Sequence, residues 1–415
     1  MSNQINDYSS SQALLERAKA VIPNGIPGHF NPVVQVPEGA YPCYVDRARG
    51  ARFWDIDGNE YIDYMCAYGP MILGYQNEVI KEAVRKQVAN TDTCTLASPV
   101  MVELAEFLVE LIPWAGWATF AKNGADATNM AVLIARSHTE RRKIIAIDDG
   151  YHGCSPWMQA LGRGGISRED HRETVRIPWN DLAALEAALE ANKGEVAALI
   201  SSPYHHPAFK DNELPEADYW SGVHALLKQH DVLSICDDVR AGFRLNMAGS
   251  PNYFGYTPDL SCYCKAIANG YPIAAVVGKN ALQDAAAGVF QTGSFWFSAG
   301  PMAAALACLK ELQRIDGPAR ILQTGEKLWR GMVEIAADAG HELKVTGVAS
   351  MPYLRTEHEA GISFHQALCG ECTQRGLFLT SHHNLFVSVA HSEADITRSW
   401  EIFSDAIKAV NASFR

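Results

Sequence analysis

Apolar and polar residues recur with two different periods along the chain, and each period predicts one kind of element. Within residues 11–21, 77–90 and 99–112, apolar positions fall three and four residues apart, which is typical of amphipathic helices. In "ARFWDIDGNEYIDY", apolar positions alternate on both sides of Asp57-Gly58. Such alternation around a turn dipeptide predicts a β-hairpin.

From about residue 117 the pattern changes to short apolar runs separated by helical stretches. The runs are "WATFAK", "KIIAID", "VAALIS", "VLSICD", "LSCYCK" and "IAAVVG", and the helices between them lie near 126–137, 181–191 and 218–228. Strands that are apolar throughout and separated by helices indicate a mainly parallel sheet covered on both faces. A long helix is expected within residues 294–315, followed by mixed α and β structure.

This order predicts an α/β fold with two domains, which a chain of 415 residues can readily form. The large domain is expected at residues 76–305. A smaller α+β domain would combine residues 1–75 with residues 306–415. In an open α/β sheet, ligands bind at the carboxyl ends of the strands, so the residues that follow each strand are the candidates for chemistry.

Composition and charge exclude several function classes. The chain is 48% hydrophobic and 20% charged, as in ordinary soluble globular proteins. Its net charge of −12 argues against nucleic acids and anionic membranes as partners, because both require a basic face. The first residues do not resemble a signal or transit peptide, and no apolar run is long enough to span a bilayer. We therefore expect a cytoplasmic protein.

The ten cysteines are expected to be free thiols. Cys262-x-Cys264 and Cys369-x-x-Cys372 resemble halves of metal sites, which the pairs His205-His206 or His382-His383 could complete. A structural zinc site normally needs two such cysteine pairs, and neither pair has a second. We therefore expect no metal, and we interpret Cys262 as a small apolar side chain in a strand.

Two predicted strands end in loops that could contact a ligand. Asn123-Gly124-Ala125 is a glycine turn that leads into a helix, and such a turn can bind an anion through backbone N–H groups. It lacks the P-loop and dinucleotide patterns. Tyr151 and His152 follow "KIIAID", where an aromatic ring could stack on a planar ligand or simply pack within its loop.

Two further strands end in charged residues. Asp237 and Asp238 close "VLSICD", and they cannot form a dyad because neighbouring strand residues point to opposite faces. Buried charges need partners. One carboxylate could take a helix N–H, Arg240 or Arg244, and the other a cationic ligand atom. Lys265 follows "LSCYC" and is either an ion-pair partner or an amine that desolvation makes nucleophilic.

One ligand, pyridoxal 5′-phosphate, suits all four candidate features. Its phosphate suits the glycine turn, its ring an aromatic side chain, its protonated ring nitrogen a carboxylate, and its aldehyde a lysine. The carboxylate would keep the ring nitrogen protonated, so that the ring can take up the electrons of a substrate carbanion. The lysine would bind the aldehyde and later move the proton.

Seven blocks in order resemble the class III aminotransferases of the fold-type-I pyridoxal-phosphate superfamily, and within them the glutamate-1-semialdehyde aminomutase group. The blocks are "AVIPNGIPG", "WDIDGNEYIDYMCAYGPMILG", "NGADATNMAVLIAR", "YHG", "DDVRAGFR", "PDLSCYCKAIANGYPIAAVVGK" and "VSVAHSEADI". The resemblance implies a seven-stranded sheet flanked by helices in the large domain. It also implies pyridoxal phosphate as cofactor and a homodimer with shared active sites.

The resemblance assigns roles by position. Lys265 matches the Schiff-base lysine, Asp237 the aspartate at the pyridine nitrogen, and Val239 the residue beneath the ring. Tyr151 matches the residue stacked on the other ring face, with His152 beside it.

The phosphate contacts are assigned in the same way. Asn123, Gly124 and Ala125 match the phosphate loop. Ser294 matches a hydroxyl residue that reaches the neighbouring subunit's phosphate, with Thr292 as the alternative.

Departures from the family lie around the substrate. Asn31 stands where the aminomutase has an arginine for the substrate carboxylate, and an amide cannot replace a bidentate guanidinium. Ala125 stands at a hydroxyl position, Ser202-Pro203 replaces a glutamate-proline pair, and Asp238 replaces a glutamate. The cofactor residues are thus retained while the substrate pocket differs. Its expected lining residues are His29, Asn31, Tyr68, His205 and His206.

The expected activity is transamination between an amine donor and a keto or aldehyde acceptor by a ping-pong mechanism. An intramolecular 2,1-aminomutase is the alternative, because it needs the same cofactor residues. A related racemase or lyase ranks lower. The presence of both Lys265 and Asp237 argues against a non-catalytic binding protein.

Overall fold

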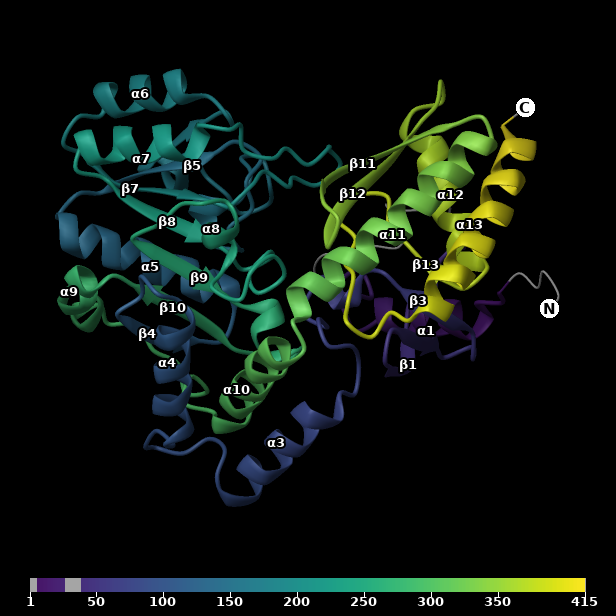
Figure 1. The fold of residues 1–415 in the computed structure, drawn as a ribbon, viewed down its shortest axis with the longest axis horizontal. Coiled ribbons are helices and arrows are strands. Elements are labelled where there is room, and N and C mark those ends of the chain that lie inside the picture. Colours follow the sequence, from purple (N-terminus) through teal and green to yellow (C-terminus); the bar gives the residue numbers. More distant parts are fainter. Residues whose placement is uncertain (1–5, 27–38, 415) are drawn as a thin grey trace. The chain divides into compact units, whose positions relative to one another are not determined.

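The computed structural model describes residues 6–26 and 39–414 (Figure 1). His29 and Asn31 lie outside the described residues. The chain divides into two compact units. Unit 1 comprises the residues up to Asn77, Ala208–Asn212 and those from Ala319 onward; unit 2 comprises Glu78–Pro207 and Glu213–Pro318. The sequence pattern placed the divisions after residues 75 and 305, and that assignment of domains stays a prediction.

Unit 2 is built on a seven-stranded sheet in the order β4-β10-β9-β8-β7-β5-β6. Its strands are β4 (Trp117–Ala121), β5 (Lys143–Ile147), β6 (Thr174–Ile177), β7 (Val196–Ser201), β8 (Leu233–Asp237), β9 (Leu260–Tyr263) and β10 (Ala274–Gly278). Strands β5 to β9 pair in parallel, and β10 is antiparallel to both its neighbours. The mainly parallel sheet is confirmed, and all six expected strands are present. The sequence pattern did not identify β6, because this edge strand is only partly buried and carries no continuous apolar run.

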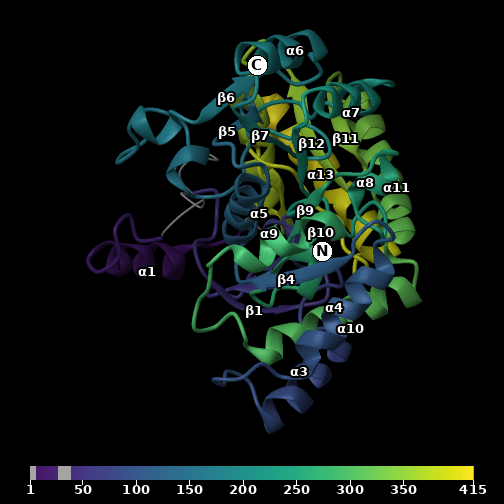
Figure 2. The same cartoon turned by 90° about the vertical axis from the view of Figure 1, so that its left-hand side faces the viewer.

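Helices cover both faces of this sheet, which explains why its strands are apolar throughout. The helices of unit 2 are α3 (Glu78–Asn90), α4 (Val100–Leu111), α5 (Gly124–Thr139), α6 (Leu182–Ala191), α7 (Tyr219–Gln229), α8 (Ser250–Tyr253), α9 (Gln283–Gly288) and α10 (Ala299–Arg314). Along β5, Ile144 belongs to the same core cluster as Ala131 of α5, whereas the next residue, Ile145, belongs to the cluster that contains Val223 of α7. Helices α6 and α7 lie side by side in both views (Figures 1 and 2).

Both ends of the chain contribute to one small sheet in unit 1. Its strands are β1 (Val45–Arg49), β2 (Arg52–Asp55), β3 (Glu60–Asp63) and β13 (Leu377–Phe378), and a separate hairpin joins β11 (Glu342–Val348) to β12 (Met351–Glu357). The predicted hairpin of β2 and β3 is confirmed, with Arg52 opposite Ile62. The helices are α1 (Ser9–Lys19), α11 (Gly317–Asp338), α12 (Ile362–Gln374) and α13 (Glu393–Ser413).

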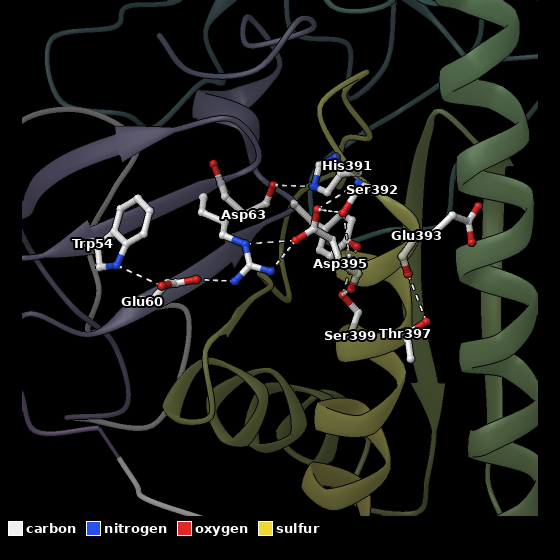
Figure 3. A network of polar contacts seen from close by, with 11 residues as sticks. Trp54, Glu60, Asp63, His391, Ser392, Glu393, Asp395, Thr397 and Ser399 are labelled. Atoms are coloured by element: carbon white, nitrogen blue, oxygen red, sulfur yellow. Dashed lines mark hydrogen bonds and ion pairs between the residues drawn. The ribbon is translucent and has the colours of Figure 1, made fainter. Parts of the chain in front are cut away.

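A polar network fastens this hairpin to the last helix (Figure 3). The Nε atom of Arg52 donates to Oδ1 of Asp395 over 3.0 Å, and Arg52 also binds Glu60. The other oxygen of Asp395 accepts from the backbone N–H of Ser392 over 2.9 Å, which caps the first turn of α13. One carboxylate therefore joins strand β2 to the start of α13.

Two further features of the chain concern membranes and thiols. None of the helices in 6–26 and 39–414 is long and apolar enough to cross a membrane. All ten cysteines carry free thiols, and Cys262, Cys369 and Cys372 are buried.

Candidate functional site

The residues that follow four strands of unit 2 lie at the same edge of the sheet. Strands β4 and β9 both run antiparallel to β10 and so point in the same direction, and β5 and β8 run parallel to β9 through the pairs of the sheet. The residues after β4, β5, β8 and β9 are Asn123, Tyr151, Val239 and Lys265, with short loops between. The topology thus brings these sequence-predicted residues to a common edge.

Asp237 ends β8 and has both carboxylate oxygens held in place. Its Oδ2 lies 2.7 Å from Nδ1 of His152, and its Oδ1 accepts the backbone N–H of Val239 over 3.1 Å. Asp237 is 5% exposed and His152 3% exposed. A carboxylate only accepts hydrogen bonds, so the proton between the two side chains belongs to Nδ1 of His152. The carboxylate therefore has a fixed orientation at low solvent exposure.

Asp238 has a partner of its own, as expected for two neighbours on opposite faces. Its Oδ2 accepts the backbone N–H of Ser250, the first residue of α8, over 2.8 Å. The sequence left a helix N–H, Arg240 or Arg244 open as a partner for one of the two carboxylates. For Asp238, the structure shows a helix N–H. Burial raises the pKa of Asp238 to about 7, although the hydrogen bonds from Ser250 oppose the change.

Lys265 is the amine of this edge. It follows β9 with a φ of 45°, a left-handed conformation that costs a side-chain-bearing residue about 1 kcal/mol or more. Burial, and next the positive charge of Arg240, lower the pKa of Lys265 to about 7; Cys264 and Asp237 act in the opposite direction. A large fraction of the amine is therefore uncharged at neutral pH, as nucleophilic attack on a carbonyl requires.

The glycine turn after β4 lies against Val239. Helix α5 begins at Gly124, and Oδ2 of Asp126 accepts the backbone N–H of Asn123 over 2.8 Å, which closes the turn. A Cβ atom added to Gly124 would lie 2.8 Å from Cγ1 of Val239, closer than such contacts allow. Glycine is therefore required at this position as long as Val239 keeps its place, and the backbone of the turn lies close to the Val239 side chain.

The same turn packs against the loop that carries Tyr151 and His152. A Cβ atom on Gly153 would lie 2.6 Å from Cβ of Ala125, and Oγ1 of Thr128 donates to the carbonyl oxygen of His152 over 2.7 Å. Tyr151 itself is about half exposed, and burial raises its pKa. Thr128 was missed by the sequence reasoning, because a threonine inside a helix carries no signal of a distant partner.

The two predicted pocket histidines of unit 2 have different surroundings. The ring of His205 stacks on Trp179 at 5.9 Å, and its backbone pairs with Glu213. His206 instead holds Arg240: Nη1 of the guanidinium donates to the carbonyl oxygen of His206 over 2.9 Å and lies 3.0 Å from its Nδ1. The sequence offered Arg240 as a partner for an aspartate, whereas its guanidinium is hydrogen-bonded to His206. A basic residue two positions after Asp238 was the available signal for its place in the site.

Other predicted residues lie elsewhere. Thr292 and Ser294 are exposed on the segment before α10. Tyr68 belongs to unit 1, where its ring lies edge-on to His383 at 5.2 Å. His382 lies in the same unit, 5.4 Å from the ring of Phe209.

The residues of unit 2 fit pyridoxal phosphate. The turn at Asn123 and Gly124 opens helix α5, whose first backbone N–H groups can bind an anion. The buried carboxylate of Asp237 is oriented, and the pKa of Lys265 is lowered. No group of three or more histidine, cysteine or acidic residues within the described part of the chain is arranged to hold a metal ion.

Comparisons with known proteins identify similar chains. The chain matches the family described as "Aminotransferase class-III" over residues 33–407. It is 39% identical to the aminopentol aminotransferase of Sphingopyxis macrogoltabida, covering 97% of this chain and 94% of that protein. It is 34% identical to a glutamate-1-semialdehyde 2,1-aminomutase of Methanothrix thermoacetophila, covering 97% of each. The solved structure of the FumI protein of Sphingopyxis sp. MTA144, in its pyridoxal-phosphate internal aldimine form, is 39% identical, with a TM-score of 0.95 over 98% of this chain and 97% of that one.

Proposed function

The chain belongs to the class III aminotransferases, which use pyridoxal phosphate, and we propose that Lys265 and Asp237 are the residues through which it transfers amino groups. One observation carries this assignment. At one edge of the sheet, a carboxylate held by His152 and the backbone of Val239 accompanies a lysine whose pKa is lowered to about 7. A buried carboxylate and an uncharged amine are the two groups that this cofactor needs.

Each residue has a distinct task. When bound, pyridoxal phosphate supplies a ring that stabilises the carbanion left when the substrate loses a proton. Asp237 holds a proton at the ring nitrogen, and Lys265 moves a proton to and from the substrate carbon. Val239 and Tyr151 would hold the two faces of the ring. The backbone of Asn123, Gly124 and Ala125 would bind the phosphate.

We propose that the amine donor carries no carboxylate next to its reacting carbon. Asn31 stands where the aminomutase group has an arginine, so the chain lacks that guanidinium for such a carboxylate. The similarity to an aminopentol aminotransferase supports the same substrate class. A keto or aldehyde compound then takes the amino group in the second half of the cycle.

We also propose a cytoplasmic homodimer with shared active sites. Phe290 is 92% and Phe295 66% exposed, and both flank the exposed Thr292 and Ser294. Large apolar side chains exposed in one segment mark contact surfaces. A second copy of the chain would cover them and place a hydroxyl group near its phosphate site.

The decisive experiment follows the cofactor's absorption during each half of the reaction. The purified enzyme should be yellow, a carboxylate-free amine should bleach that colour, and a keto acid or aldehyde should restore it. The Lys265→Ala variant should bind cofactor without catalysing either change. Full turnover by Lys265→Ala would contradict the assignment. Isomerisation of one amino aldehyde with no separate acceptor would instead identify an aminomutase.

A further inference from the structure

Two buried histidines of unit 2 line the same small cavity. His152 and His206 contribute to its wall together with Trp179, Ser201, Ser202 and Tyr204. His206 is 9% exposed and His152 3%. The Nε2 atom of each ring is buried and has no hydrogen-bond partner within residues 6–26 and 39–414. A buried polar atom without a partner is costly, so two of them on one cavity point to a bound polar group.

The partner of His206 decides what its free nitrogen can do. Nδ1 of His206 lies 3.0 Å from Nη1 of Arg240, and a guanidinium only donates hydrogen bonds. Nδ1 therefore accepts, and the ring proton sits on Nε2. Burial, and next the charge of Arg240, lower the pKa of His206 well below its ordinary value, so the ring remains neutral. His206 thus offers the cavity a hydrogen-bond donor.

His152 offers the opposite. Its Nδ1 donates to the carboxylate of Asp237 over 2.7 Å, which is the tautomer of a neutral imidazole that leaves Nε2 without a proton. Its Nε2 then presents a lone pair and accepts a hydrogen bond. A carboxylate cannot donate to His152, and an ammonium group cannot accept from His206. A group that both donates and accepts satisfies both nitrogens.

We propose that this cavity is a hydroxyl site, which binds an alcohol group of the substrate amine or a water in its place. The proposal rests on the proposed function and adds the substrate class: amines that carry a hydroxyl group. Ser202, the residue after β7, contributes to the fit, because it lines the cavity with a short side chain where a longer one would take up space. An oxygen bonded to both Nε2 atoms would complete one chain of hydrogen bonds from Asp237 through both histidines to Arg240.

The test compares an amino alcohol with the matching amine that lacks the hydroxyl group, by the rate at which each bleaches the holoenzyme. We expect the amino alcohol to have a kcat/KM about 10- to 100-fold higher. His206→Asn places an amide near Nδ1 but removes the Nε2 donor, so it should abolish the preference. His206→Gln places an amide N–H near Nε2 and should retain most of it.

His224→Asn is the matched control. His224 is also a partly buried histidine of unit 2 whose Nε2 has no partner within the described residues, but it packs on Tyr256 and does not line the cavity. This variant should keep the full preference. Folding of each variant is checked by its unfolding temperature.

A crystal structure of the holoenzyme distinguishes the two sources of the oxygen. A preference for the amino alcohol, lost only in His206→Asn, identifies the substrate hydroxyl. Equal rates, with one ordered water within hydrogen-bond distance of both Nε2 atoms, identify water. Equal rates with no oxygen bound to both nitrogens overturn the proposal. Bleaching by either amine leaves the transaminase assignment intact in every case.

Discussion

Nδ1 of His152 lies 2.7 Å from Oδ2 of Asp237, and both side chains are almost fully buried. The imidazole reaches this position because Thr128 of α5 holds the carbonyl oxygen of the same residue. A hydrogen bond to a charged carboxylate is stronger than one between neutral groups. His152 therefore acts as a positioning residue for Asp237.

Removal of that hydrogen bond should slow catalysis. With an amine that lacks a hydroxyl group, His152→Phe should lower kcat about 10- to 100-fold, because the carboxylate loses a charge-assisted partner. His152→Asn retains an N–H near the Nδ1 position and should recover most of the rate. Half-reaction kinetics measure both. Equal losses in the two variants would show that the contact with Asp237 is unimportant.

The lowered pKa of Lys265 can be measured in the cofactor-free enzyme. A free amine reacts with trinitrobenzenesulfonate only when uncharged, so the reaction of Lys265 should rise with a midpoint at about pH 7. An ordinary lysine titrates at about 10.4. Arg240→Met removes a neighbouring positive charge and should move the midpoint upward. The fast-reacting group should be missing in Lys265→Ala, and a midpoint near 10 in the native protein would refute the prediction.

The contact between Gly124 and Val239 predicts a compensated pair of substitutions. Gly124→Ala places a Cβ atom 2.8 Å from Cγ1 of Val239 and should cost about 1–3 kcal/mol in cofactor binding. Val239→Ala removes the clashing methyl groups, so the double variant should bind cofactor better than Gly124→Ala alone. Cofactor titration of the four proteins gives the coupling free energy. Additive effects would contradict the close contact.

Asp395 should stabilise the fold in a pH-dependent way. Burial opposes the change, but hydrogen bonds from Ser392 and Arg52 lower the pKa of Asp395. A carboxyl with a lowered folded-state pKa contributes stability above its unfolded value of about 3.9, and this contribution is lost as the pH falls through the folded value. Asp395→Asn should therefore destabilise the protein by about 1–3 kcal/mol at pH 7 and by less near pH 3.

A second acidic residue of α13 provides the control for that experiment. Glu401 pairs with Arg398 on the same helix over 2.8 Å, but both side chains are about half exposed. Glu401→Gln should change the unfolding free energy by about 0.5 kcal/mol or less. Chemical denaturation at both pH values measures each variant. A larger effect at Glu401 than at Asp395 would contradict the role given to the network.

The proposed homodimer predicts a change of mass. Replacement of Phe290 and Phe295 by serine should shift the particle toward the monomer in light scattering, because both rings are exposed on the single chain. Leu161→Ser, at another exposed apolar position of unit 2, should leave the mass unchanged. A monomeric native protein, or a mass unaffected by both substitutions, would refute the proposal.

The sequence revealed the mainly parallel sheet and six of its seven strands, because strands buried on both faces are apolar throughout. It missed β6, whose edge position requires no such run. The opposite directions of Asp237 and Asp238 followed from strand geometry and are confirmed by their separate partners. The bond between His206 and Arg240 could not be foreseen, because it joins residues 34 positions apart. No local pattern specifies which of several nearby polar groups a guanidinium contacts.

The parallel pairing of β3 with β13 has a consequence for biosynthesis. The last strand of the sheet around Lys265 ends at Gly278, whereas the partner of β3 begins only at Leu377. Because ribosomes add residues from the amino end, the hairpin made first obtains its final strand, and the contact of Arg52 with Asp395, only near the end of translation. A nascent chain released before Leu377 would contain every strand of the seven-stranded sheet. It would lack β13, the fourth strand of the small sheet that β1, β2 and β3 begin.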